Sequence, residues 1–395
     1  MRISTVTFQH DALGQMDSLQ ADLAQTQNQL ATGKKLQSAA DDPAGMAQLN
    51  QLNAQLSASQ QYVTNGNSAS ANLQLEEQAM SDATNVLQSA RDLAVQANDA
   101  SLTAAQRQDI ATQLSQQLQD LVAIGNRTDS NGNFLFAGTS SATQPFAQTA
   151  NTVTYSGAAS VSQIQISPNQ RISSGDTGAS VFMNIPAGNG TFTTAAAASN
   201  TGTGSIGPGT VTNAAAWVPD TYSVSFTSPT QYQVTNGSGT VVSSGSFSDG
   251  DTISFNGVQV AISGSPAAGD QFTVAQAGKA SAFSTVAGLI TTLSSPNLSS
   301  AQLSTAIGGA LQQMDGAISN LNNVAASVGA RLNSITSSQS TAQAVQTNLQ
   351  TSVSHLSDVD YAAAITQLNT EELSLQAAQE SYASIARLSL FNFLQ

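Results

Sequence analysis

Asp249 and Asp251 are two carboxylates separated by a single glycine, a spacing that would suit cation binding or paired acid–base catalysis. A hydrolase that cleaves glycosidic bonds needs two carboxyl groups about 5 to 9 Å apart across a cleft. The alternating apolar residues on both sides predict instead that these aspartates are solvated residues of a turn between strands. Since only 9% of residues are charged, an enzyme built on this pair is the least favoured function.

Other chemistry-bearing patterns are weak. Cysteine is absent, which excludes thiol nucleophiles, disulfides and Cys-ligated zinc, and the two histidines, His10 and His355, lie far apart in sequence. The GxGxxG match at 202–207 lies in a Gly/Thr-rich stretch with no strand before it and no helix after it. Residues 129–133 begin like a calcium loop, but Phe134 stands where that loop requires glycine, so we expect a tight turn. We predict no catalytic site, no cofactor and no metal site.

Adjacent glutamates, Glu76 with Glu77 and Glu371 with Glu372, fall on predicted helices, where sequence neighbours do not face each other. The net charge is −14, from 10 basic and 24 acidic residues. A nucleic-acid partner is excluded because the positive charge that would neutralise phosphates is missing.

The first residues lack the apolar stretch of a secretory signal, and no run approaches the roughly 18 apolar residues of a membrane span. We therefore expect no membrane insertion and no cleaved signal.

Aromatic residues divide the chain into a centre and two flanks. Fourteen of the Phe, Tyr and Trp residues lie between 134 and 283, and only six lie outside that stretch. The flanks are rich in Ala, Leu and Gln, with apolar residues at helical spacing, whereas the centre is rich in Gly, Ser, Thr, Val and Phe. The sequence therefore predicts an α+β protein, with long helical coiled-coil or bundle arms from both termini and a β-rich domain inserted between them.

The N-terminal flank predicts three helices. The first has an apolar stripe at heptad spacing and stops at Gly33. The second begins at Asp42–Pro43, where Asp caps the helix and Pro takes its first position, and Asn65–Asn67 is a candidate interruption. A capping box at Thr103–Gln106 begins the third helix, which ends near Gly125.

The C-terminal flank predicts a short helix over 283–293, a longer one after Ser300, and a last amphipathic helix after a break at Asp358–Asp360. Glycines within the long helix mark either breaks or places where a neighbouring backbone approaches closely. These glycines are Gly308, Gly309, Gly316 and Gly329.

The centre predicts strands at Tyr222–Phe226, Tyr232–Val234 and Phe272–Val274. Residues 253–262 form the clearest hairpin, because Asn-Gly suits a type I′ turn. Residues 187–215, rich in Gly, Ala, Thr and Asn, predict a long loop.

A helix with one narrow apolar stripe is rarely stable alone, so the terminal stripes should pair with each other, with other subunits, or with both. We predict five segments: a terminal assembly arm (1–42), a helical domain (43–140 and 280–354), an inserted β-rich outer domain (141–279) and a second assembly arm (355–395). The predicted assembly interface comprises Met16, Leu19, Leu23, Leu30, Leu349, Val353, Leu356, Leu368, Leu375, Tyr382, Ile385 and Phe391. The alternative is that these stripes form only an intramolecular bundle, as we expect for Leu49, Leu56, Leu114, Leu121, Leu311 and Leu332.

Short motifs at both ends now indicate a family. The chain reads LATGKKLQSAADDPAGMA at 30–47 and SVGARLN at 327–333, and these segments resemble the two ends of flagellins and flagellar hook-associated proteins. MRIST at 1–5, GNFLFAG at 132–138 and LSLFNFLQ at 388–395 look more like the hook–filament junction proteins of this family. AAGDQFTV at 267–274 resembles β-domain segments of hook-associated proteins.

This resemblance implies a structural role at the bacterial flagellum, outside the cell, and export through the flagellar type III apparatus without a cleaved signal. It implies arms that fold into a coiled coil on assembly. The implied partners are hook-associated protein 1, flagellin, copies of the chain itself in a ring-like layer, and a cytoplasmic export chaperone at the C-terminal region. Two alternatives are a flagellin, which would polymerise into filaments, and a secreted adhesin with a helical stalk, which would need an anchor or a signal.

Overall fold

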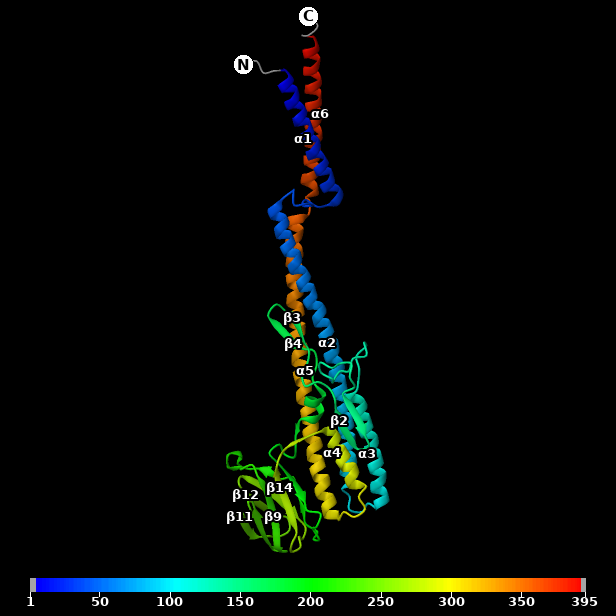
Figure 1. Ribbon diagram of the computed structural model, residues 1–395, viewed down its shortest axis with the longest axis vertical. Coiled ribbons are helices and arrows are strands. Elements are labelled where there is room, and N and C mark those ends of the chain that lie inside the picture. The colour runs from blue at the N-terminus through cyan, green and yellow to red at the C-terminus, as the bar shows by residue number, and fades with distance from the viewer. Residues whose placement is uncertain (1–4, 392–395) are drawn as a thin grey trace. The chain divides into compact units, whose positions relative to one another are not determined.

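The computed structural model describes residues 5–391, and the side chains of these except residues 5, 6, 8, 9 and 385–391. Long helices form both flanks and strands fill the centre (Figure 1), which confirms the predicted α+β class. The chain divides into two compact units. The first holds the two ends of the chain, up to residue 64 and from residue 339 onward, and the second is residues 65–338. These divisions fall inside two long helices rather than at residues 42 and 355.

The first unit contains two helices that are far apart in sequence. Helix α1 (Thr5–Thr32) packs against α6 (Tyr361–Phe391), and Figure 1 shows the two side by side. Helix α1 ends before Gly33, whose φ of +69° is in the left-handed region that suits glycine. The first turns of α2 (Pro43–Ala97) and the last turns of α5 (Ser300–Ser357) complete this unit.

The predicted start of α2 is confirmed, because Asp42 Oδ1 accepts hydrogen bonds from the backbone N–H groups of Ala44 and Gly45, each at 3.0 Å. Helix α2 continues without interruption through Asn65–Asn67. Gly66 is buried, so tertiary packing outweighs the weak helix propensity of these residues.

The second unit is built on a helical core. Helix α3 (Ala104–Gly125) begins at the predicted capping box and packs against α4 (Ala282–Leu293). Leu114 and Leu121 are fully buried in one cluster with residues of α2, α4 and α5, and Leu311 and Leu332 pack against it. In the first unit, Leu49 is buried and Leu56 is half-buried.

Residues 126–186 pack onto this helical core rather than forming part of a separate β-domain. Phe136, Phe146 and Phe182 are fully buried beside Phe283 of α4, and the rings of Phe146 and Phe283 lie 4.8 Å apart. The segment contains β1 (Phe146–Thr149) paired with β2 (Thr152–Tyr155), β3 (Gln163–Ser167) paired with β4 (Gln170–Ser173), a short helix (Ala179–Met183), and β5 (Ile185–Pro186) paired with β15 (Lys279–Ala280). The predicted insertion at 141–279 thus contributes to two cores.

The second core lies between two antiparallel sheets. A five-stranded sheet has the order β11-β10-β9-β14-β6, and β12, β13, β7 and β8 form the other layer. Their bounds are β6 (Phe192–Ala196), β7 (Ser205–Ile206), β8 (Thr210–Val211), β9 (Thr221–Ser228), β10 (Gln231–Thr235), β11 (Val241–Ser246), β12 (Thr252–Phe255), β13 (Val258–Ser263) and β14 (Gln271–Gln276). Tyr222, Val224 and Phe226 alternate into this core. We call this part the β-sandwich.

The β12–β13 hairpin has the predicted type I′ turn, since Asn256 and Gly257 have φ values of +42° and +74°. The prediction of a long loop over 187–215 is wrong, because β6, β7 and β8 lie within it. Phe192 and Ile206 are buried in the sandwich core. Isolated apolar residues of this kind give no period that the sequence would show.

Polar side chains of α5 connect the β-sandwich to the helical core. Thr305 Oγ1 accepts a hydrogen bond from the Ile206 backbone at 3.2 Å, and Gln313 Oε1 accepts one from Gly188 at 3.0 Å. The glycines of α5 neither break the helix nor mark a close approach within the described chain. A Cβ added at Gly308, Gly309 or Gly329 would have no neighbour within 4 Å, and one at Gly316 would lie at an ordinary contact distance of 3.9 Å from Ile185 Cγ2 and Pro186 O.

Candidate assembly interface

Two loops meet where α1 and α6 join the long helices, and we call residues 33–36 and 357–361 the loop junction. The backbone N–H of Lys35 donates to Ser357 O at 2.6 Å, and that of Val359 donates to Gly33 O at 3.0 Å. A Cβ at Gly33 would lie 2.8 Å from the Tyr361 hydroxyl. The junction therefore joins both ends of the chain through backbone hydrogen bonds, and the positive φ at position 33 favours glycine there.

A charged pair adds to the loop junction. Lys34 Nζ donates to Asp358 Oδ1 at 2.5 Å, while Ser354 Oγ donates to Asp358 Oδ2 at 2.6 Å. The hydrogen bond from Lys34, with those from Ser354 and Ser357, lowers the pKa of Asp358 to about 2. The pair is exposed, so solvent and salt screen it.

The predicted stripe residues lie on α1 and α6, which pack against each other, and on α5. All those with described side chains are half-buried: Met16, Leu19, Leu23 and Leu30 on α1, Leu349, Val353 and Leu356 on α5, and Leu368, Leu375 and Tyr382 on α6. The side chains of Ile385 and Phe391 lie outside the described residues. Helix α1 contacts α6, so the half-burial of these stripe residues is consistent with pairing of the two helices within one chain.

A different set of apolar residues, outside the predicted assembly interface, remains exposed on the first unit. We call it the exposed apolar set: Leu13, Val345, Tyr361, Ile365 and Leu373. Leu373 is the most exposed at 68%, and Ile365 is 50% exposed.

The aspartate pair of the β-sandwich stabilises turns. Asp249 Oδ1 accepts from the Gly264 backbone, and Asp251 Oδ2 accepts from the Ser248 backbone at 2.7 Å. Asp129 Oδ1 likewise accepts from Asn131 and Asn133, as in the predicted tight turn. Over the described part of the chain, no three His, Cys, Asp or Glu side chains gather in a way that would hold a metal ion. The helices searched there include none with the length and apolarity of a membrane span.

Family models match both helical flanks and part of the centre. Residues 3–141 match the bacterial flagellin N-terminal helical region, and residues 311–394 match the bacterial flagellin C-terminal helical region. Residues 195–276, within the β-sandwich, match a D2-like domain of flagellar hook-associated protein 1. The helical flanks and the inserted β-sandwich therefore define a flagellin-like protein of the bacterial flagellum.

Solved structures are covered almost completely by this chain. FlgL from Xanthomonas campestris has a TM-score of 0.71 at 32% identity, over 76% of this chain and 98% of that one. The flagellar hook-associated protein 3 from Legionella pneumophila has a TM-score of 0.73 at 30% identity, over 78% and 98%. The chain belongs to the family of flagellar hook-associated protein 3, FlgL, as its terminal motifs predicted.

Curated relatives are matched over a shorter span. Flagellar hook-associated protein 3 of Salmonella typhimurium is 30% identical over 185 residues, which are 47% of this chain and 58% of the relative. The Escherichia coli protein of the same name is 28% identical over the same shares. The matches thus span little more than half the length of these relatives. Polar flagellin A of Vibrio parahaemolyticus is 35% identical over 35% of each chain.

Proposed function

We propose that this chain is an adaptor of the bacterial flagellum that joins the hook, through hook-associated protein 1, to the flagellin filament. The observation that carries the proposal is the coverage of 98% of a FlgL structure at 32% identity. A second solved relative, from Legionella pneumophila, is itself described as a flagellar junction protein. An adaptor role fits a chain whose described residues include no metal cluster and whose aspartate pair is engaged in turns.

Assembly would use the terminal helices. The interface is the twelve predicted residues together with the exposed apolar set, in a layer of copies of the chain. Burying one exposed leucine or isoleucine stabilises a complex by about 2 kcal/mol. Few charges would need to be desolvated, since Gln, Asn, Ser, Thr and Ala cover most of the helix surfaces. Half-buried stripes can exchange their partner within the chain for a partner in a neighbouring copy.

Export and location form part of the same proposal. The chain would leave the cell unfolded through the flagellar export apparatus, without a cleaved signal, after a cytoplasmic chaperone has bound its C-terminal region. After export the arms would fold as the α1–α6 pair and exchange that pairing for neighbouring copies at the growing end of the flagellum, which couples their rearrangement to binding. The absence of cysteine fits passage as an unfolded chain.

The test replaces an exposed leucine in the bacterium that makes this protein. Leu373→Asp puts a charge into the proposed interface, whereas Asn369→Asp puts the same charge at an exposed polar position of α6. We expect Leu373→Asp cells to shed filaments into the medium and to keep bare hooks in electron micrographs, while Asn369→Asp cells keep their filaments. Attached filaments in cells carrying both Leu373→Asp and Ile365→Asp would contradict the proposed interface.

A filament subunit is the second candidate, because flagellins match a third of the chain. Purified protein added to filament seeds distinguishes the two. An adaptor stops after one layer, whereas a flagellin elongates the seeds into long filaments.

A further inference from the structure

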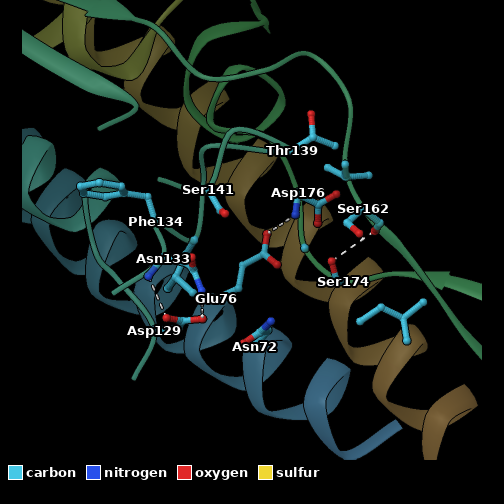
Figure 2. Close-up of a pocket in the computed structure, with 15 residues that line it drawn as sticks. Asn72, Glu76, Asp129, Asn133, Phe134, Thr139, Ser141, Ser162, Ser174 and Asp176 are labelled. Atoms are coloured by element: carbon cyan, nitrogen blue, oxygen red, sulfur yellow. Dashed lines mark hydrogen bonds between the residues drawn. The ribbon is translucent and has the colours of Figure 1, made fainter. Parts of the chain in front are cut away.

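The second unit contains a polar cavity of about 370 Å³ that the adaptor role does not use. Figure 2 shows it between helix α2, which carries Asn72 and Glu76, and two loop segments. The loop segments contribute Asp129, Asn133 and Ser141 on one side and Ser174 and Asp176 on another. Its lining is made mainly of carboxylates, amides and hydroxyls, and none of the lining residues is basic.

Glu76 is the unusual member of this lining. Its side chain is only 1% exposed, and Figure 2 shows its carboxyl group in the middle of the lining residues. Oε1 accepts a hydrogen bond from the Asp176 backbone at 3.0 Å, but Oε2 has no hydrogen-bond partner. A buried polar atom without a partner costs about 1–3 kcal/mol, so a donor that reached Oε2 would be bound favourably.

The other two carboxylates of the cavity already have partners. Asp176 Oδ2 accepts from Arg331 of α5, which lies outside the lining and also donates to Gly175 O at 3.2 Å. Asp129 Oδ1 accepts two backbone N–H groups, and its Oδ2 accepts from the Asn133 amide at 3.1 Å. Glu76 Oε2 is therefore the buried carboxylate oxygen of this cavity that has no partner among the described residues.

We propose that this cavity binds an organic cation, an ammonium or guanidinium group whose N–H donates to Glu76 Oε2. A metal ion fits less well, because no three acidic or histidine side chains within the described residues gather as metal ligands do. An ammonium or guanidinium group carries several N–H donors. The remaining donors would bond the oxygens of Asn72 and the surrounding hydroxyls, and Asp129 and Asp176 would add negative potential.

Binding would be linked to proton release. Burial, and next the charge of Asp176, raise the pKa of Glu76 to about 8 against the opposing effect of Arg331. Below that pH the carboxyl is protonated in the free protein, so the entering cation displaces one proton to solvent. The affinity should therefore rise with pH until Glu76 is ionised. The cation is either a small molecule or a Lys or Arg side chain of a second copy.

The experiment is a calorimetric titration of the full-length protein with methylguanidinium chloride, at constant ionic strength. A guanidinium group stays charged at both pH values used. We expect at least tenfold tighter binding at pH 9 than at pH 6.5. Glu76→Gln should weaken binding at pH 9 at least tenfold, whereas Glu77→Gln, which removes the adjacent exposed carboxylate, should bind as the wild type does.

Equal affinity at the two pH values, or equal affinity of Glu76→Gln and wild type, overturns the proposal. The pH comparison uses the wild-type protein and so does not depend on the folding of a variant. Sedimentation at pH 9 then identifies the source of the cation. Self-association that methylguanidinium reverses indicates a basic side chain of a second copy, and a monomer that binds methylguanidinium indicates a small molecule. Neither result depends on flagellar attachment, so this test is separate from that of the adaptor role.

Discussion

Lys34 Nζ and Asp358 Oδ1 lie 2.5 Å apart although 324 positions separate the two residues in sequence. Backbone hydrogen bonds between Lys35 and Ser357 and between Val359 and Gly33 flank this ion pair. Bringing residues this far apart in sequence together costs conformational entropy, which the contacts at the junction must offset. The pairing of α1 with α6 therefore depends on the loop junction together with the apolar contact of the two helices.

Asp358→Asn should remove a pH dependence of the stability of the first unit. The hydrogen bonds from Lys34 and the two serines hold the folded-state pKa of Asp358 at about 2, below the ordinary value of 3.8. The ionised pair therefore stabilises the fold above pH 4, and this stabilisation is lost as the pH falls through the folded pKa. Hydrogen exchange of α1 peptides at pH 5, 3.5 and 2, corrected for intrinsic rates, should show protection falling in this window only when Asp358 is present.

The matched variant for this measurement is Asp17→Asn, which removes a carboxylate from α1 outside the loop junction. It should retain the wild-type fall in protection. A wild-type profile that is flat between pH 4 and pH 2 would show that the Lys34–Asp358 pair does not contribute to holding α1.

Glu76→Gln should remove a pH dependence of the stability of the second unit. This dependence has the opposite sign to the one that Asp358 gives the first unit. The folded-state pKa of about 8 lies above the ordinary value of 4.5, so the neutral form stabilises the fold. That stabilisation is complete below pH 4.5 and is lost as the pH rises to 8, by up to about 1.4 kcal/mol per pH unit. Urea unfolding at pH 5, 6.5 and 8.5 should show the wild type losing stability with rising pH and Glu76→Gln losing much less.

Glu77→Gln provides the comparison, because Glu77 is exposed on the same helix. It should follow the wild type at every pH. A Glu76→Gln variant no more stable than wild type at pH 8.5 would refute the burial of a neutral carboxyl group at this position.

Arg331→Ala should destabilise the second unit by about 3 kcal/mol. The Arg331 side chain is only 14% exposed and pairs with Asp176, so its removal takes away the ion pair and its hydrogen bonds to the carbonyl groups of Ser173 and Gly175. Arg91→Ala is the control, since its ion pair with Asp315 is exposed and should contribute less than about 1 kcal/mol. Urea midpoints at pH 7 measure both, and equal losses would contradict the difference in burial.

Local signals made the helix ends and one turn predictable. Gly33, Asp42–Pro43 and Thr103–Gln106 set helix boundaries through backbone conformation and capping, and Asn256–Gly257 sets the type I′ turn. Each of these features depends on residues within a few positions of each other, so the sequence alone predicts it. The family resemblance, also carried by short motifs, was predictable for the same reason.

Long-range packing was not predictable. Glu76 and Glu77 look alike in sequence, yet one is buried by a loop 100 positions away and the other is exposed. Leu368 and Leu373 are both apolar residues of α6, yet Leu368 is half-buried and Leu373 is exposed on a helix that contacts α1. The predicted β-rich insertion divides between two cores, because Phe136, Phe146 and Phe182 pack in the helical core. The alternation of residues within the strands does not predict this packing.

Phe226→Ala should destabilise only the sandwich core of the second unit, and Phe182→Ala should destabilise its helical core. Phe226 packs edge-on against Phe247 and Phe272 in the sandwich, whereas Phe182 packs against the helical core. Each truncation leaves a cavity that costs about 3–5 kcal/mol. Hydrogen exchange should therefore rise in β9 and β14 for Phe226→Ala with α4 unchanged, and in α4 for Phe182→Ala. Equal increases in α4 and β9 for Phe226→Ala would mean that the polar contacts of Thr305 and Gln313 couple the two cores into one cooperative unit.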